Sequence, residues 1–375
     1  AAGNCGNSTG FADLGRVSSL TAADPARSTT TSYDGFDTTH TDAGGHDTTR
    51  QINALGQVIA TIDPDGTGTA FAYDSQGNRV AVTTAAFTSS QSTVHYTYAA
   101  LGRMIAQDDP DHGVYTYRYD ALGNRIEEVS PRMAEANQRV TFEYDLLGRM
   151  TRRNEPEGET TWTYDYTGNS NLGIGRLRKE SMPGFSRIYK YAAAEFGRLT
   201  WLRTNIGSTR YTQTFDYDST GNLVYETYPG GFGVEYIHNH LGYQERVQEA
   251  GGAAVLYQLL ETDASGRILG EWRGDGSKTY QTFDGNSSRL ASQEAVNPDR
   301  GYTIQHFTYS FDDVGNMTAR SDLVQGQSES FGYDNLSRLT GAELTGGNTL
   351  SYGFDPSGNI IDKSDTGTPF IYACL

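Results

Sequence analysis

The pattern Asp-x-x-Gly, preceded by an aromatic residue and followed by Asn or Arg, recurs along almost the whole chain. Clear copies are YDSQGNRV (73–80), YDALGNRI (119–126), YDLLGRMT (144–151) and YDSTGNLV (217–224), and YDNLSRLT (333–340) is a copy with serine in the glycine place. Successive copies are about 21 to 27 residues apart, except for one double-length step near Tyr33. Self-similarity at a fixed period of this length indicates a repeat architecture. Such a chain gains its stability from contacts between neighbouring repeats.

Each repeat carries a second turn signal midway, as in IDPDGTG (62–68) and YPGGFG (228–233). Pro presets φ and Gly accepts positive φ, so these segments reverse the chain. Two turns in each repeat leave two strands of about 6 to 9 residues, which is one β-hairpin per repeat. A helical repeat is the poorer alternative, because glycine and β-branched residues are too frequent and the aromatic residues are spaced by two. We therefore predict an all-β fold of stacked hairpins that forms a long curved antiparallel ribbon.

The residues of one copy have separate roles. Alternation places Tyr115, Tyr117 and Tyr119 on one face of a strand, and stacking would align such rings in ladders across strands. We expect the tyrosine hydroxyl to reach water or a backbone carbonyl. The carboxylate of Asp120 can accept hydrogen bonds from amides of the turn. Gly123 supplies the left-handed residue of a type I turn followed by a bulge.

The predicted structural site is the set of tyrosine, aspartate and glycine residues in the clearest copies. Its members are Tyr73, Asp74, Gly77, Tyr119, Asp120, Gly123, Tyr144, Asp145, Gly148, Tyr217, Asp218, Gly221, Tyr333 and Asp334. Ser288 and Ser337 take the glycine place in two copies, where positive φ would strain them. Ala99 and Ala192 take the aspartate place, and we expect these turns to lack the side-chain cap.

The rhythm continues from Gly15 to Asn359 without interruption. A chain of 375 residues would otherwise suggest two or three domains and can bury a large core. We predict a single array of about 16 units over residues 1–375, with terminal segments at 1–10 and 362–375. About 16 hairpins correspond to about 32 strands.

Charge and cysteine content restrict the partners and the compartment. The formal net charge is −17, and only four of the 29 Lys and Arg residues are lysine. Such a surface repels phosphate backbones and anionic lipid, so we expect no nucleic-acid partner. No apolar run approaches the roughly 20 residues of a membrane span.

The two cysteines, Cys5 and Cys374, lie near opposite ends of the chain. They are candidates for a disulfide within the chain or between subunits, and two unrelated thiols are the alternative. The pair fits an oxidising compartment, so we predict a secreted, extracellular or cell-surface protein. The sequence begins AAGNCG without Met, as a mature form or an excised fragment would.

The sequence gives no positive case for an enzyme. It has no phosphate loop and no zinc-type cysteine set. His238 and His240 share a strand face, but the sequence has no third candidate ligand at a spacing typical of a metal site. The acidic segments 63–66 and 108–111 coincide with midpoint turns and lack the ligand order of a calcium loop. We predict no catalytic residues, no cofactor and no metal.

The copies YDALGNRI, YDLLGRMT and YDSQGNRV resemble the YD repeat of the Rhs family, and the resemblance covers the chain from Phe11 to about Ile361. This family includes bacterial Rhs polymorphic toxins, wall-associated proteins, the B and C components of insecticidal toxin complexes, and teneurins. The resemblance implies a ribbon that spirals into a hollow shell or tube, which encloses a toxin domain in the bacterial proteins. The self-cleaving closing motif of the family is absent, because GFDPSGNI (353–360) is an ordinary repeat. Protease and toxin activity are therefore not implied.

Two functions are compatible with this resemblance. The first is a non-catalytic structural β-shell segment of a secreted Rhs-type protein that encapsulates or delivers a C-terminal toxin or effector. The alternative is a complete extracellular structural or adhesive subunit that assembles end to end into a tube or filament. The expected partners are further YD-repeat segments or identical subunits, an enclosed effector domain, and a cell-surface glycan or protein.

Overall fold

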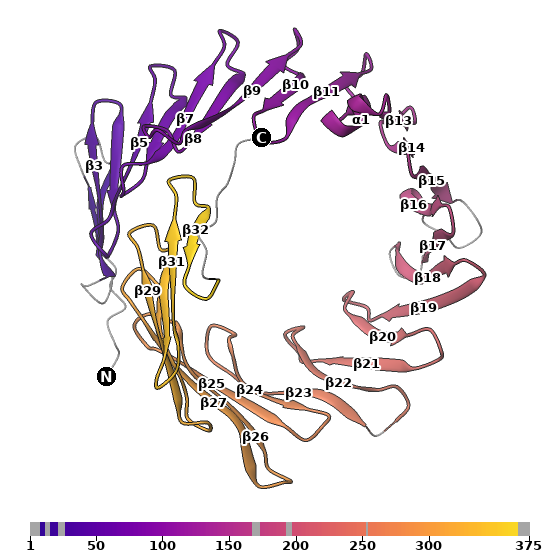
Figure 1. Ribbon diagram of the computed structural model, residues 1–375. Helices are drawn as coiled ribbons and strands as arrows, with labels where there is room; N and C mark the ends of the chain where they lie inside the picture. The colour runs from indigo at the N-terminus through magenta and orange to yellow at the C-terminus, as the bar shows by residue number, and fades with distance from the viewer. Residues whose placement is uncertain are drawn as a thin grey trace. The chain divides into compact units, whose positions relative to one another are not determined.

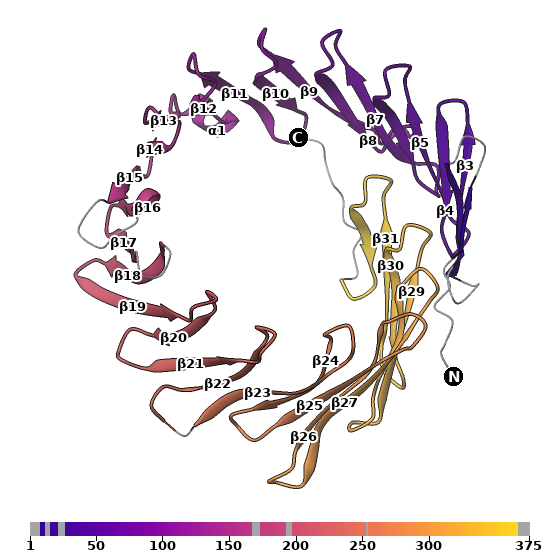
Figure 2. The same cartoon turned by 180° about the vertical axis from the view of Figure 1, so that it is seen from behind.

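The structure is a computed structural model that describes residues 8–11, 16–21, 27–166, 173–192, 197–252 and 254–366. These residues form 32 strands and one short helix (Figures 1 and 2). The chain divides into two compact units. The first consists of Ala1–Val114, Gln281–Ala295 and Thr303–Leu375, and the second of Tyr115–Tyr280 and Val296–Tyr302. Since this division follows spatial contacts, the array of about 16 units over residues 1–375 stays a prediction.

Strand follows strand along the chain, with a single helix between them in the described residues. The first strands are β1 (Ser8–Phe11), β2 (Val17–Thr21), β3 (Thr29–Asp34), β4 (Asp37–Thr41), β5 (Asp47–Ile52), β6 (Val58–Ile62), β7 (Gly68–Tyr73), β8 (Arg79–Thr84), β9 (Ser92–Tyr98) and β10 (Met104–Asp109). The next elements are β11 (Gly113–Tyr119), β12 (Arg125–Val129), α1 (Pro131–Glu135), β13 (Val140–Tyr144), β14 (Met150–Glu155), β15 (Gly158–Tyr166), β16 (Gly173–Met182), β17 (Phe185–Ala192) and β18 (Arg198–Ile206). They are followed by β19 (Thr209–Tyr217), β20 (Leu223–Thr227), β21 (Gly233–His238), β22 (Gln244–Glu249), β23 (Val255–Thr262), β24 (Ile268–Arg273) and β25 (Lys278–Phe283). The last strands are β26 (Leu290–Asn297), β27 (Tyr302–Phe311), β28 (Met317–Asp322), β29 (Gln327–Tyr333), β30 (Leu339–Leu344), β31 (Thr349–Phe354) and β32 (Ile360–Lys363).

In each unit, strands pair antiparallel with their neighbours in the chain. In the first unit the pairing runs from β1 to β10 and from β27 to β32. In the second unit it runs from β11 to β25. The prediction of an all-β antiparallel ribbon of consecutive hairpins is confirmed.

The strand register shifts beside the aromatic residue at the repeat turns. The shift falls between Ala72 and Tyr73 in β7, and between Glu143 and Tyr144 in β13. A bulge at this point sets two residues of one strand against one of its partner and increases the local twist. Because the shift recurs at the same place of the motif, the aromatic side chain points to the same face in successive hairpins.

Few side chains are buried in the described part of the chain. The buried hydrophobic residues are Ala60, Ala85, Ala86, Val140, Phe142 and Val234. The length of the chain would allow a large core, but a hairpin ribbon leaves most side chains half exposed. Stability therefore comes from backbone pairing and from surface buried between neighbouring repeats, not from one central core.

The helix α1 replaces the midpoint turn between β12 and β13 and was not predicted. Ser130 caps it, since its hydroxyl accepts a hydrogen bond from the amide of Met133 at 3.3 Å. Pro131 occupies the first turn, where its missing N–H costs nothing. The Ser-Pro pair was the signal in the sequence that could have revealed this helix.

Tyrosine hydroxyls join successive repeats to one another. In eight cases in the described residues, the hydroxyl donates to a backbone carbonyl two positions after the key glycine of the preceding repeat, at 2.8–3.0 Å. The pairs are Tyr33 with Val17, Tyr73 with Val58, Tyr98 with Arg79, Tyr144 with Arg125, Tyr164 with Met150, Tyr191 with Leu177, Tyr217 with Leu199, and Tyr333 with Met317. The tyrosine of one repeat is thus a link to the one before it.

Replacing Tyr144 by Phe tests this link. The change removes the hydrogen bond from the hydroxyl to the carbonyl of Arg125, which is 2.8 Å long, and keeps the ring. We expect the free energy of unfolding to fall by about 0.5–1.5 kcal/mol, measured by denaturant titration. Tyr115→Phe is the matched control, because the hydroxyl of Tyr115 has no hydrogen-bond partner within the described residues. Equal losses in both variants would contradict the assignment.

Candidate functional site: the repeat turns

The turn at residues 120–124 shows the geometry of the motif. The amide of Asp120 donates to the carbonyl of Asn124 at 2.9 Å. In return, the carboxylate of Asp120 accepts from the Asn124 amide at 2.8 Å through Oδ1, and from Asn124 Nδ2 at 2.9 Å through Oδ2. The aspartate therefore satisfies the amide at the end of the turn and also orients the side chain at the fifth place of the motif.

The other aspartates of the predicted site lie in the same arrangement. The corresponding pairs are Asp74 with Asn78, Asp145 with Arg149, Asp218 with Asn222, and Asp334 with Arg338. In two turns an asparagine takes the aspartate place: Oδ1 of Asn53 accepts from the amides of Leu55 and Gln57 at 2.9 and 3.1 Å. The backbone acceptor role thus needs the oxygen and not the charge.

These hydrogen bonds favour the ionised carboxylate. The side-chain bond from Asn124 is the main cause that lowers the pKa of Asp120, and that from Asn78 lowers the pKa of Asp74. At Asp145 the amide and then the guanidinium of Arg149 lower the pKa of the carboxyl. Hydrogen bonds to the charged form stabilise that form relative to the acid.

The glycine place of the motif holds the left-handed backbone conformation. The φ angles are 87° at Gly77, 92° at Gly123, 75° at Gly148 and 98° at Gly221. Ser288 and Ser337 have φ of 57° and 58°, so two side chains are held in this sparsely populated region. The hydrogen bonds and contacts of the surrounding turn must offset the conformational free energy that this backbone strain costs.

The fifth place of the motif has a role that the sequence did not reveal. Where it is arginine, the guanidinium lies over the aromatic ring of the next repeat. The distances from Cζ to the ring centroid are 4.4 Å for Arg149 and Tyr164, 5.5 Å for Arg198 and Tyr217, 5.6 Å for Arg289 and Phe311, and 4.9 Å for Arg338 and Phe354. The predominance of arginine over lysine was the available signal, since a planar guanidinium stacks on rings and still donates hydrogen bonds.

Arginine also links repeats whose aromatic residue has no hydroxyl. Phe311 and Phe354 stand at the tyrosine place of two copies. In the first, Arg289 donates to the carbonyl of Asp312. In the second, Nη1 of Arg338 donates to the carbonyl of Asp355 at 3.3 Å. The connection to the preceding repeat is therefore kept by a different donor.

The grooves of the described surface contain no evident chemical centre. One of about 420 Å³ lies beside Trp162 and includes Asp145, Arg149 and Asp165. Arg149 pairs with both carboxylates, at 2.7 Å from Oδ2 of Asp145 and in direct contact with Asp165. Its guanidinium lowers the pKa of Asp165 to about 2, so both acids are ionised and paired, which does not suit a general acid near neutral pH.

His238 and His240 lie with Asp218 and Asn222 in a groove of about 510 Å³. Among the described residues, no three or more His, Cys, Asp or Glu side chains are placed to hold a metal ion. Cys5 and Cys374, the predicted disulfide candidates, lie outside the residues that the structure describes.

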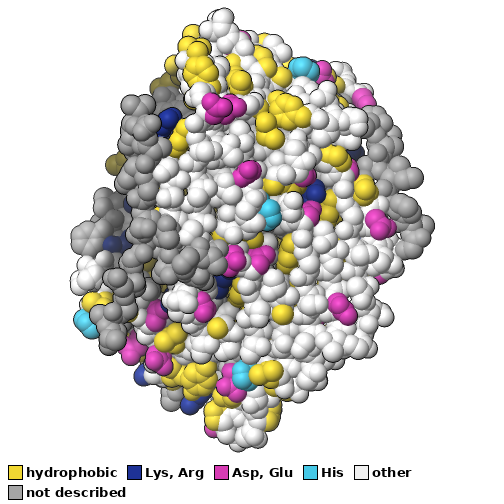
Figure 3. Space-filling view, turned by 90° about the vertical axis from the view of Figure 1, so that its left-hand side faces the viewer, with side chains coloured by type: hydrophobic (Ala, Val, Ile, Leu, Met, Phe, Trp, Pro, Cys, Tyr) yellow, Lys and Arg dark blue, Asp and Glu magenta, His cyan; other side chains and the backbone are white. Residues whose placement is uncertain are grey.

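Charged side chains are dispersed on the face shown in Figure 3. Acidic, basic and histidine side chains lie there among hydrophobic side chains and other groups. On this face the acidic side chains are not gathered into one patch.

Ala99→Asp restores the missing cap in one turn. The backbone turn is already present, since the amide of Ala99 donates to the carbonyl of Arg103 at 2.8 Å. A carboxylate there can accept from amides of the turn, so we expect the free energy of unfolding to rise by about 0.5–1.5 kcal/mol. Ala100→Asp, one place later, should give no gain. Equal effects of the two substitutions in denaturant titrations would refute the cap.

Acid should weaken the turns in a defined direction. Because the pKa of Asp120 is lowered from its usual 3.8 in the folded state, its charge contributes stability above about pH 4 that is lost as the pH falls through the folded value. Asp120→Asn keeps the acceptor oxygen but not the charge. We expect the variant to be less stable than the parent at pH 6, and the gap to shrink towards pH 2. Thermal unfolding at the two pH values measures this, and an unchanged gap would exclude a role for ionisation.

Part of the chain matches a known repeat family. A family model described as RHS Repeat matches residues 53–86 and 98–132. No curated protein matches the chain. In addition, the described residues include no helix with the length and apolar character needed to cross a membrane.

Solved structures share the fold. The Tc holotoxin pore of Photorhabdus luminescens with a mutated TccC3 has a TM-score of 0.80 at 15% identity, with 95% of this chain and 21% of that chain covered. The complexes TcdB2-TccC3-Cdc42 and TcdB2-TccC3 without its hypervariable C-terminal region have TM-scores of 0.81 and 0.79 at 15% and 16% identity. In both, 97% of this chain and 22% of the other are covered.

The chain thus spans about a fifth of the length of the proteins that it resembles in structure. Similarity at this level of identity speaks for the fold, while the repeat motif and the matched segments speak for the family. Residues 53–86 and 98–132 are thus similar to the RHS Repeat family, and the chain shares the fold of these solved structures.

Proposed function

We propose that the chain is a non-catalytic wall segment of a secreted Rhs-type protein, and that the wall encloses or delivers a C-terminal toxin or effector. The observation that carries the proposal is the series of tyrosine hydroxyls, each of which bonds to the carbonyl of the preceding repeat. Such links make a continuous sheet from hairpins that would be marginal alone. A continuous sheet of this kind is suited to form a wall.

The chemistry of the turns agrees with a mechanical role. The aspartates of the motif accept hydrogen bonds from their own turns, and arginines pair with those carboxylates or lie over rings. These charged groups are thus engaged in holding the ribbon. A cofactor or a metal has no part in the proposal.

The structural relatives support the enclosed cargo. Their names refer to a Tc holotoxin pore and to complexes of TcdB2 with TccC3, one of which lacks a hypervariable C-terminal region. If this chain serves a similar purpose, its partners are further YD-repeat segments and an effector domain that continues from the wall. A secreted location follows from the same proposal.

The native product tests this function. Its intact mass, taken from the producing cells and their medium, should exceed that of the 375 residues by the rest of the wall and an effector domain. Limited proteolysis should leave the effector intact until denaturant opens the wall. A secreted native product with only the mass of these residues would contradict the proposal, and so would an effector cleaved as fast as free domain.

A further inference from the structure

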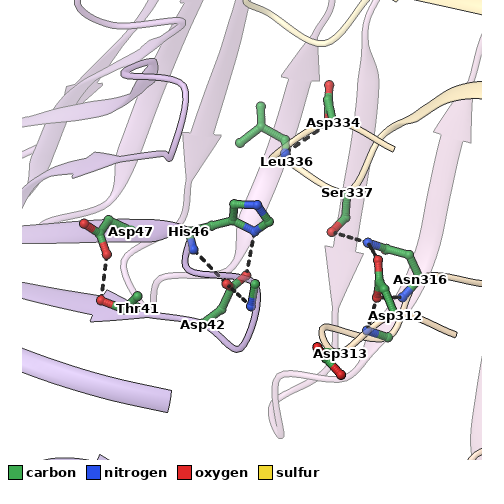
Figure 4. A network of polar contacts seen from close by, with 12 residues as sticks. Thr41, Asp42, His46, Asp47, Asp312, Asp313, Asn316, Asp334, Leu336 and Ser337 are labelled. Atoms are coloured by element: carbon green, nitrogen blue, oxygen red, sulfur yellow. Dashed lines mark hydrogen bonds and ion pairs between the residues drawn. The ribbon is translucent and has the colours of Figure 1, made fainter. Parts of the chain in front are cut away.

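Within the first unit, two segments that are far apart in the sequence meet edge to edge. The turn at residues 42–46, between β4 and β5, lies beside the turns at 312–316 and 334–338 (Figure 4). A Cβ added to Gly44 would lie 3.2 Å from Cγ1 of Val314, so the backbone of one turn lies against the side chain of the other. Nη2 of Arg338 is 4.0 Å from Oδ2 of Asp65.

The two edges in this contact are different. Successive hairpins place every second connection on the same edge of a ribbon. The Asp-x-x-Gly turns therefore line one edge, which we name the Tyr-Asp edge, and the midpoint turns line the other, which we name the midpoint edge. The turn at 42–46 and Asp65 belong to the midpoint edge of β3–β9, whereas Val314 and Arg338 belong to the Tyr-Asp edge of β27–β32. The contact is heterologous in the sense used for subunit interfaces.

Burial at the third place of the motif reports where this contact exists. Val314 and Leu336, which stand at this place in the covered turns, are half-buried. Leu55 and Leu101 hold the same place in the first unit, in turns that no other described segment covers, and are 83% and 76% exposed. Large aliphatic side chains at this exposure are costly to leave in water. A surface of the same kind is thus covered at one end of the unit and bare at the other.

The midpoint edge of β27–β32 is also uncovered by the described residues. Leu323 and Val324, in the turn between β28 and β29, are 56% and 42% exposed. The next midpoint turn, between β30 and β31, contains Gly346 and Gly347, just as Gly44 and Gly45 stand in the turn that makes the internal contact. Exposed consecutive glycines let an apolar side chain approach the backbone. The first unit therefore has one uncovered Tyr-Asp edge and one uncovered midpoint edge, in addition to the two edges that already contact each other within it.

We propose that the Tyr-Asp edge formed by the turns at 53–57, 74–78 and 99–103 binds the midpoint edge at 322–326 and 344–348 of a second copy of this chain. Because the contact joins unlike edges, each added copy leaves the same two edges free, and stacking continues. The charges at these turns are few, namely Asp74, Arg103 and Asp322. The carboxylates of Asp74 and Asp322 are engaged by their own turns. Asp74, Arg103 and Asp322 together carry a formal charge of −1, so these turns hold little of the net charge of −17.

This inference goes beyond the proposed function, because it names a second copy of this chain as the occupant of edges that the described residues leave uncovered. The copies join through the turns at the ribbon edges, not through backbone pairing of end strands such as β32. The exposed leucines then have a role that the repeat fold itself does not require.

Sedimentation velocity of the purified chain over a wide concentration range tests the proposal. The parent chain should associate into species that grow with concentration. Leu55→Asp with Leu101→Asp blocks one edge, and Leu323→Asp with Val324→Asp blocks the other, so each double variant should be monomeric. An equimolar mixture of the two variants should form dimers and nothing larger, because only one pair of edges remains intact.

The control places the same charges away from the edges. Leu256→Asp with Leu260→Asp changes two exposed residues of β23 and should leave association unchanged. Circular dichroism and thermal unfolding establish that every variant is folded. A folded parent that stays monomeric throughout overturns the inference, as does association that persists in both edge variants. Neither result bears on the proposed function, which is tested separately by the intact mass and the protease protection of the native product.

Discussion

In the described residues, eight tyrosine hydroxyls each join one repeat of this ribbon to the repeat before it. The hydroxyl of a tyrosine at the end of one strand donates to a carbonyl just beyond the turn of the preceding repeat. A hairpin alone is marginally stable in water, and the described residues contain few buried side chains that could compensate. The hydroxyl fixes the distance between consecutive turns, so backbone pairing, ring packing and turn geometry are all held in one register.

The turn residues explain why the bond falls at a constant place. Aspartate, glycine and the side chain at the fifth place form a closed unit, as in Asp145, Gly148 and Arg149, and a bulge next to the aromatic residue sets its direction. Where phenylalanine replaces tyrosine, Arg289 and Arg338 donate to the next turn instead. The hydroxyl and the guanidinium are thus two solutions to the same requirement, which is a donor that reaches from one repeat to the next.

Much of this arrangement could be read from the sequence, because the controlling interactions are local. Hairpins, the alternation of Tyr115, Tyr117 and Tyr119 and the positive φ at Ser288 and Ser337 all follow from residues within one repeat. The helix α1 escaped prediction because a midpoint turn was expected at every repeat. The stacking of Arg149 on Tyr164 and the contact of Gly44 with Val314 also escaped it. They join residues of different repeats, and a motif that is repeated many times does not reveal which copies meet.

A wall built from nearest-neighbour contacts has a weakness at its boundaries. An interior repeat receives a hydroxyl from the next repeat and gives one to the previous repeat, whereas a terminal repeat has only one of these links. The edges have the same deficit, since turns carry no backbone pairing to a second layer. In the first unit, the midpoint edge of β3–β9 contacts the Tyr-Asp edge of β27–β32, where the side chains of Val314 and Leu336 are half-buried. Lateral contact between turns is therefore the means by which a thin sheet can stabilise its margins without adding a core.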